Sequence, residues 1–72
     1  MSLKLIAEDF IDPLAIDKVL PLYEALVIAT RLEPGCIHYE LCHDIKKPGH
    51  FIFIEEWRDE SALDAHVASA HF

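Results

Sequence analysis

The chain has 72 residues, so it forms at most one domain, and a domain of this size is marginally stable on its own. Its 13 acidic and 6 basic residues give a net charge of −7, which argues against binding to nucleic acids or anionic membranes. Hydrophobic residues make up 53% of the chain, more than a small monomer can easily bury. We therefore expect a homodimer that binds a neutral or weakly charged organic ligand.

The sequence carries no signal for export or membrane insertion. The N-terminal segment lacks the apolar stretch of a signal peptide, and no run approaches the roughly 20 apolar residues of a membrane span. Cys36 and Cys42 are six residues apart on one predicted strand, a separation of roughly 20 Å, which is too long for a disulfide. We therefore expect a cytoplasmic protein with two reduced cysteines.

The first half of the chain predicts a strand followed by a long helix. Side chains alternate loosely over residues 3–10, as in a strand, and an Asp-Pro pair then favours a helix start. Residues 14–33 are apolar most of the way round a helix, which indicates burial on more than one side. Pro21 should kink this helix or mark a later start, and Gly35 should end it in a left-handed conformation.

The second half predicts two strands and a shorter helix. Residues 36–44 alternate with a period of two, and a Lys-Lys-Pro-Gly turn separates them from the next strand. Residues 51–57 begin as an aromatic and β-branched run, which favours a strand buried on both faces. Asp59 or Ser61 can then cap a second helix. The inner face of that helix is expected to carry Leu63, His66, Val67 and Ala70.

These elements predict a single α+β domain over residues 1–72. The order strand, helix, strand, strand, helix begins a ferredoxin-like split βαβ arrangement, and the short turn makes the last two strands a hairpin. This arrangement calls for a fourth strand after the second helix, whereas the sequence ends at Phe72. We expect that C-terminal strand in the full-length protein.

Several short motifs in this chain resemble one known family. Their residues are Glu33-Pro34-Gly35-Cys36, Tyr39-Glu40-Leu41, Phe53-Ile54-Glu55-Glu56-Trp57, Ala62-Leu63-Asp64-Ala65-His66 and Ser69-Ala70-His71-Phe72. In order and spacing they resemble the antibiotic biosynthesis monooxygenase (ABM) domain of the dimeric α+β barrel superfamily. The resemblance implies a homodimer in which two four-stranded sheets pack face to face, with the helices outside. The absent last strand is the one departure from this pattern.

The resemblance also implies an activity, namely oxygenation of an electron-rich aromatic compound such as a quinol or polyketide phenol. This reaction uses O₂ and no metal, haem or flavin, because the substrate itself is the reductant. A base removes a proton from the phenol, and the resulting anion passes an electron to O₂. The protein must therefore supply a dry apolar pocket, a proton acceptor and polar groups that hold the anion.

The predicted catalytic residues are His66, Trp57 and Glu55. His66 is the candidate base because histidine titrates near neutral pH, although a helix histidine can simply bond a backbone group. Trp57 could stack on the substrate or only pack in the core, and Glu55 could orient His66 or form a solvated strand-end carboxylate. We expect Trp57 and His66 to face a common pocket between the sheet and the helices. The predicted substrate-binding residues are Tyr23, Tyr39, Phe51, Phe53 and His71.

The spacing of the histidines argues against a metal site. His38 and His43 fall on opposite faces of one strand, so they cannot share an ion there. His66 and His71 are five residues apart, a poor spacing for one helix face. We therefore expect neither a metal ligand set nor another cofactor.

Three other functions remain open from the sequence. Haem-degrading enzymes resemble this chain in fold but use an asparagine and a tryptophan where it has Asp9 and His66. The chain could instead be a small dimeric barrel without catalysis, which binds an aromatic metabolite or acts in a stress response. A metabolite isomerase using the same histidines is the third alternative. A Soret band on haem titration would indicate the haem-degrading enzyme, and binding without turnover would indicate the non-catalytic barrel. Product formation without O₂ uptake would indicate the isomerase.

Overall fold

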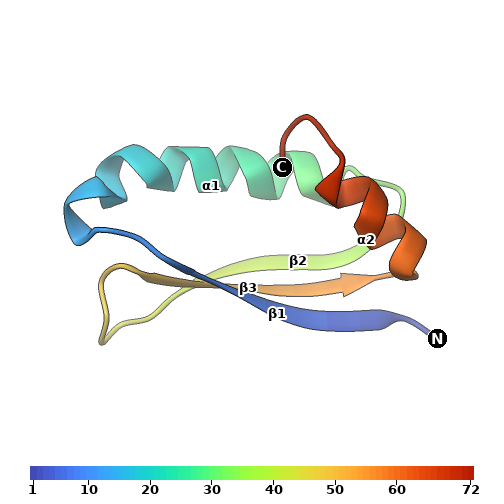
Figure 1. Ribbon diagram of the computed structural model, residues 1–72, viewed down its shortest axis with the longest axis horizontal. Helices are drawn as coiled ribbons and strands as arrows, with labels where there is room; N and C mark the ends of the chain where they lie inside the picture. The colour runs from blue at the N-terminus through green and yellow to red at the C-terminus, as the bar shows by residue number, and fades with distance from the viewer.

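The predicted α+β, ferredoxin-like fold is confirmed by the computed structural model, which describes residues 1–72. Three antiparallel strands form one sheet in the order β1-β3-β2, and both helices lie on the same face of it (Figure 1). Neither helix has the length and apolarity that crossing a bilayer requires. The elements are β1 (Leu3–Phe10), a short 3₁₀ turn η1 (Pro13–Ala15), α1 (Ile16–Arg31), β2 (Cys36–His43), β3 (His50–Trp57) and α2 (Glu60–Val67).

The register of the central strand brings distant parts of the chain to one end of the sheet. β3 pairs with both neighbours, so that Trp57 lies opposite Leu3 on β1 and opposite Cys36 on β2. A bulge between Cys36 and His38 interrupts the alternation expected for β2, and it leaves Ile37 55% exposed. The loop after α1 therefore meets the end of β3 and the beginning of α2.

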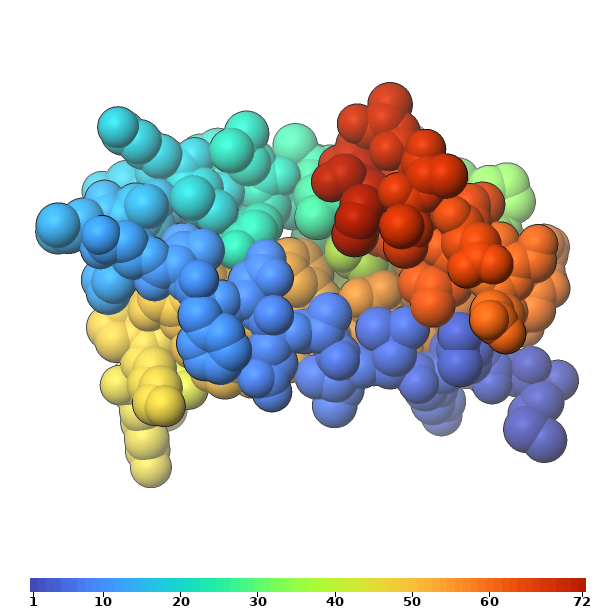
Figure 2. All heavy atoms as spheres, viewed as in Figure 1, coloured from blue at the N-terminus to red at the C-terminus, as the bar shows by residue number.

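The core lies on only one face of the sheet. The inward side chains of β3, which include Phe51, Phe53 and Trp57, are buried beneath the helices. Ile54 points to the other face and is 38% exposed, so within one chain this strand is buried on one face only. On α1, the outer residue Leu22 is likewise 68% exposed within one chain. The physical reason is that both helices cover the same face, as the ribbon and sphere views show (Figures 1 and 2).

The two helices differ from their predicted bounds. α1 starts at Ile16 and continues past Pro21 to Arg31, so the predicted helix start after Pro21 is wrong. The proline nevertheless removes one backbone hydrogen bond from the helix. α2 is capped by Asp59, as expected, but it ends at Val67, which is 53% exposed rather than inward. The helix ends because the chain turns at Ser69. The backbone N–H and the hydroxyl group of Ser69 both donate to the carbonyl oxygen of His66, at 3.0 and 2.6 Å.

Gly35 allows close packing rather than an unusual backbone conformation. No residue in the protein has a positive φ, so the predicted left-handed glycine is wrong. A Cβ atom at Gly35 would instead overlap the Cβ of Ala62 in the first turn of α2. The Gly35 carbonyl also accepts a hydrogen bond from the Arg58 backbone N at 2.8 Å. The loop after α1 is thus held directly against α2.

We predict that Gly35→Ala lowers the free energy of unfolding by roughly 1–3 kcal/mol, because the added methyl group overpacks this contact. In the double variant with Ala62→Gly, the atom nearest to the added Cβ of residue 35 is the Cα of residue 62, at 3.4 Å, which is an ordinary contact distance. Urea unfolding of the two single variants and the double variant should therefore show that the double variant loses less stability than the sum. Additive losses would contradict the close packing.

Candidate functional site

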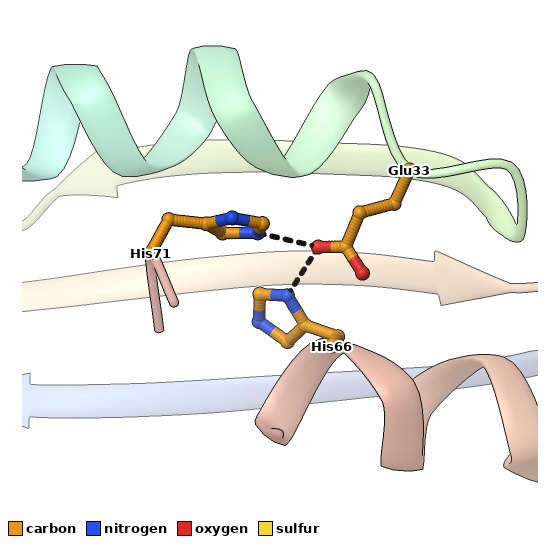
Figure 3. Close-up of side chains that lie close together, drawn as sticks. All are labelled: Glu33, His66 and His71. Carbon is orange, nitrogen blue, oxygen red and sulfur yellow. Dashed lines mark hydrogen bonds and ion pairs between the residues drawn. The ribbon is translucent and has the colours of Figure 1, made fainter. Parts of the chain in front are cut away.

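Three polar side chains converge at the Trp57 end of the sheet. The Oε2 atom of Glu33 lies 2.7 Å from Nδ1 of His66 and 2.8 Å from Nε2 of His71 (Figure 3). Glu33 comes from the loop after α1, His66 from α2 and His71 from the turn after α2. His66 is 1% exposed, whereas the side chains of Glu33 and His71 are 15% and 28% exposed. One carboxylate oxygen thus joins two imidazoles at the edge of the core.

The local folding of the chain explains this convergence. Cys36 lies opposite Trp57, so Glu33, three residues earlier, falls beside the segment that follows β3. His71 reaches Glu33 because α2 has already ended and the chain has turned back. The spacing of five residues between His66 and His71 disfavours a shared face only in a continuous helix. The two histidines therefore meet at one carboxylate, contrary to the expectation from their spacing.

The hydrogen bonds fix which nitrogen of His66 is free. A carboxylate can only accept hydrogen bonds, so the nitrogen that faces Glu33 must donate. A neutral His66 then carries its proton on Nδ1 and keeps a lone pair on Nε2, an assignment that follows from the pairing. Nε2 is buried and has no hydrogen-bond partner in the protein. The result is an oriented imidazole with one unpaired basic nitrogen.

The ionisation of Glu33 reflects two opposing effects. Burial raises the pKa of its carboxyl group, but the hydrogen bonds from His71 and His66 outweigh burial and hold the pKa below the ordinary value of 4.5. Glu33 is therefore negatively charged at neutral pH. This charge is what allows it to hold both imidazoles in place.

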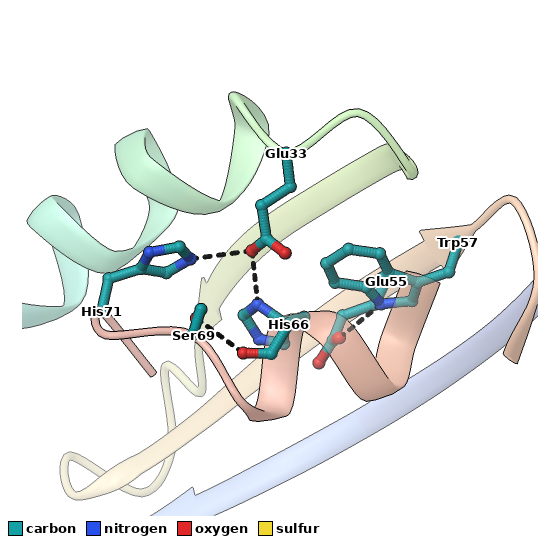
Figure 4. Close-up of polar contacts among 6 residues, drawn as sticks. All are labelled: Glu33, Glu55, Trp57, His66, Ser69 and His71. Atoms are coloured by element: carbon teal, nitrogen blue, oxygen red, sulfur yellow. Dashed lines mark hydrogen bonds and ion pairs between the residues drawn. The ribbon is translucent and has the colours of Figure 1, made fainter. Parts of the chain in front are cut away.

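A second buried pair lies beside the first. The indole Nε1 of Trp57 donates to Oε1 of Glu55 at 2.9 Å, and Trp57 is completely buried (Figure 4). The two residues are neighbours on the same face of β3, as the alternation of the strand predicts. Glu55 therefore orients Trp57, and the carboxylate that orients His66 is Glu33 instead.

Aromatic rings enclose the imidazole of His66. The ring centroids of Trp57, Phe72 and Tyr39 lie 4.8, 4.9 and 5.5 Å from that of His66. Trp57 and His66 thus come together as expected, but their rings pack against each other and leave no open space between them. The largest surface hollow, about 610 Å³, lies elsewhere and is lined mainly by outward-facing strand residues such as Ile6 and Ile54. The expected common pocket is therefore a packed aromatic cage rather than an open cavity.

The predicted substrate-binding residues fall into two groups. Tyr39 and His71 belong to the surroundings of His66, whereas Phe51 and Phe53 pack against Tyr23 farther along the sheet. The hydroxyl group of Tyr23 donates to Asp9 Oδ2 at 2.8 Å. Burial and this hydrogen bond raise the pKa of Tyr23 to about 12. Burial and the nearby Glu55 charge also raise the pKa of Tyr39 well above its ordinary value.

Sequence reasoning did not place Glu33 in the site, although Glu33 belongs to one of the motifs that resemble the family. The signal that could have found it is the hairpin register. Once residue 36 is paired with residue 57, a carboxylate three residues before β2 must approach the start of α2. No local motif carries this information, because Glu33 and His66 are 33 residues apart.

Comparison with known proteins identifies the family. The family model for antibiotic biosynthesis monooxygenase matches residues 3–72, so the chain belongs to this family. A crystal structure of an antibiotic biosynthesis monooxygenase superposes with a TM-score of 0.95 at 61% identity, covering 100% of this chain and 75% of that one. The structure of Rv0793 from Mycobacterium tuberculosis gives a TM-score of 0.89 at 31% identity, covering 99% of this chain and 71% of that one.

The curated relatives are longer proteins. YcnE of Bacillus subtilis, provisionally named a monooxygenase, is 35% identical over 49 residues, which are 68% of this chain and 52% of YcnE. The uncharacterized protein sll1783 of Synechocystis is 34% identical over 56 residues, which are 78% of this chain and 38% of that protein. The chain thus spans about half or less of the length of these relatives.

Proposed function

We propose that this chain forms the catalytic domain of a cytoplasmic monooxygenase that oxidises a small electron-rich aromatic compound, such as a quinol or a polyketide phenol, with O₂ and without a cofactor. Membership of the antibiotic biosynthesis monooxygenase family and the names of its relatives support a monooxygenase-like function. The observation that carries the proposal is the unpaired, buried Nε2 of His66, whose ring is oriented by Glu33. That nitrogen is the proton acceptor such a reaction requires.

The proposed reaction begins with proton transfer from the aromatic substrate to Nε2 of His66. The substrate anion then gives one electron to O₂, and the two radicals combine to form a carbon–oxygen bond. Cleavage of the resulting peroxide leaves one oxygen atom as a carbonyl group on the substrate. His66 returns its proton to the other oxygen, which departs as water together with the single hydrogen that the oxidised ring carbon carried. The substrate thus supplies all the electrons, and Glu33 stabilises the transient imidazolium through its negative charge.

The surroundings of His66 supply the other requirements. The high pKa of Tyr39 keeps its hydroxyl group protonated, so it can donate a hydrogen bond to a substrate anion. Trp57, held by Glu55, offers a fixed aromatic wall from which water is excluded. Because His66 is 1% exposed, substrate must displace part of the cage to reach it. Phe72, which is 64% exposed, is the outermost of these rings.

We predict that His66→Ala lowers the turnover of a quinol, followed as O₂ uptake, by about 10²-fold or more, because the general base is lost. Alanine suits a helix, so the variant should keep its fold, which the near-UV spectrum of Trp57 checks. The matched control is His38→Ala, since His38 lies on the surface and bonds only Glu40. Full activity of His66→Ala would contradict the role of the base.

The same assay separates the alternative functions. Binding of the quinol without O₂ uptake would indicate a non-catalytic barrel that binds an aromatic metabolite. Product formation without O₂ uptake would indicate an isomerase, and a Soret band on haem titration would indicate a haem-degrading enzyme. Each of these results would replace the proposed monooxygenase reaction.

We also propose that the chain forms a homodimer through the face of the sheet that carries no helix. Large apolar residues are exposed there, with Ile6 67% and Phe10 68% exposed, and the largest surface hollow opens on the same face. Large apolar side chains that are exposed on one face are typical of protein interfaces. Such a dimer should bury more than roughly 2,000 Å² in total.

Sedimentation velocity should show a dimer at micromolar concentration, which Ile6→Lys weakens because it places a charge in the apolar interface. The matched control is Leu22→Lys, because Leu22 is equally exposed, at 68%, but lies on α1. A folded monomer of the unaltered chain at micromolar concentration would contradict the dimer, as would weakening by the α1 variant alone.

A further inference from the structure

We propose that Glu33, His66 and His71 form a binding site for one divalent transition-metal ion, of the class of Zn²⁺ or Co²⁺. Two imidazole nitrogens and one carboxylate oxygen, one from each residue, all lie within 4.8 Å of one another. These are ligand types that such ions prefer, and three protein ligands are the number found at open, four-coordinate sites. The site was not expected from the sequence, because it depends on the early end of α2.

The geometry requires only small movements to close around an ion. Ligand atoms around a tetrahedral ion of this class lie about 3.4 Å apart, given bonds of about 2.0–2.1 Å. His66 is fixed in the core, whereas Glu33 and His71 are partly exposed and can adjust around it. Figure 3 shows the two rings turned toward the same carboxylate group. A bound ion would replace the two hydrogen bonds that now join the three side chains.

The rest of the chain offers no comparable set of ligands. His38 pairs only with Glu40 at the surface, and His43 bonds the carbonyl of Pro48. His50 contacts two carboxylates, but through different ring nitrogens. The cluster of Glu33, His66 and His71 is the one place where three ligand atoms from histidine, cysteine or acidic residues converge. Binding should therefore saturate at one ion per chain.

Metal binding would change the state of His66. An ion on Nδ1 uses the lone pair of that nitrogen, so a neutral ring must then carry its proton on Nε2. The nitrogen that serves as the base in the metal-free protein is thereby blocked. This consequence rests on the proposed function, under which a bound ion inhibits O₂ uptake, whereas the metal site itself does not depend on it.

The single tryptophan of the chain provides a direct readout of the site. The ring centroid of Trp57 lies 4.8 Å from that of His66, so an ion with an open d shell bound there should quench its fluorescence. Titration of the metal-free protein with Co²⁺ alone should quench Trp57 with a stoichiometry of one. Zn²⁺, which has a filled d shell, should then compete and restore the emission.

Variants make this test specific. His71→Ala removes one ligand from a partly exposed turn, and it should weaken Co²⁺ binding by at least about tenfold. Glu33→Gln should weaken binding likewise, whereas His38→Ala should bind Co²⁺ as the unaltered chain does. Absence of quenching, equal affinity in His71→Ala, or loss of binding in His38→Ala would each overturn the metal site.

An activity measurement on the same samples keeps the two proposals separable. Stoichiometric Co²⁺ binding together with inhibition of O₂ uptake by Zn²⁺ supports both of them. Binding without any effect on turnover supports the metal site and contradicts the role of Nε2 as base. Inhibition without quenching of Trp57 would place the inhibitory ion elsewhere and overturn the metal site.

Discussion

The hydrogen bond of 2.7 Å between Glu33 and His66 is the contact on which the functional interpretation of this protein depends. It joins the loop after α1 to the last turn of α2, and it satisfies one of the two nitrogens of a polar ring that is buried in the core. The same bond decides which imidazole nitrogen carries the proton. Both the proposed base and the proposed metal site follow from this one contact, and they are mutually exclusive states of His66.

Several packing features hold that contact in place. The register of β2 against β3 sets Glu33 beside the start of α2, and the absence of a side chain at Gly35 lets the loop approach Ala62. The bond between Glu55 and Trp57 fixes a large ring against the other side of His66. Because these groups are buried and in contact, a change at one of them should alter the energetics of the others.

The elements of the fold and about half of the candidate site could be predicted from the sequence. Local alternation and apolar spacing predicted all three strands and both helices, and they also placed Trp57 near His66. Glu33 could not be found in this way, and neither could the contact of His71 with it, although His71 itself was expected to bind substrate. The position of Glu33 depends on pairing between strands, and that of His71 depends on the hydrogen bonds of Ser69 that end α2. Likewise, hydrophobicity alone did not reveal that both helices cover the same face of the sheet.

The most direct test of this account is the protonation state of the His66 ring, measured by ¹⁵N NMR in the metal-free protein at neutral pH. Nitrogen chemical shifts and their couplings to the ring protons distinguish a protonated nitrogen from an unprotonated one. The account predicts a neutral ring with the proton on Nδ1, donated to Glu33, and a lone pair on Nε2. A proton on Nε2, whether in the other neutral tautomer or in an imidazolium ion, would contradict it.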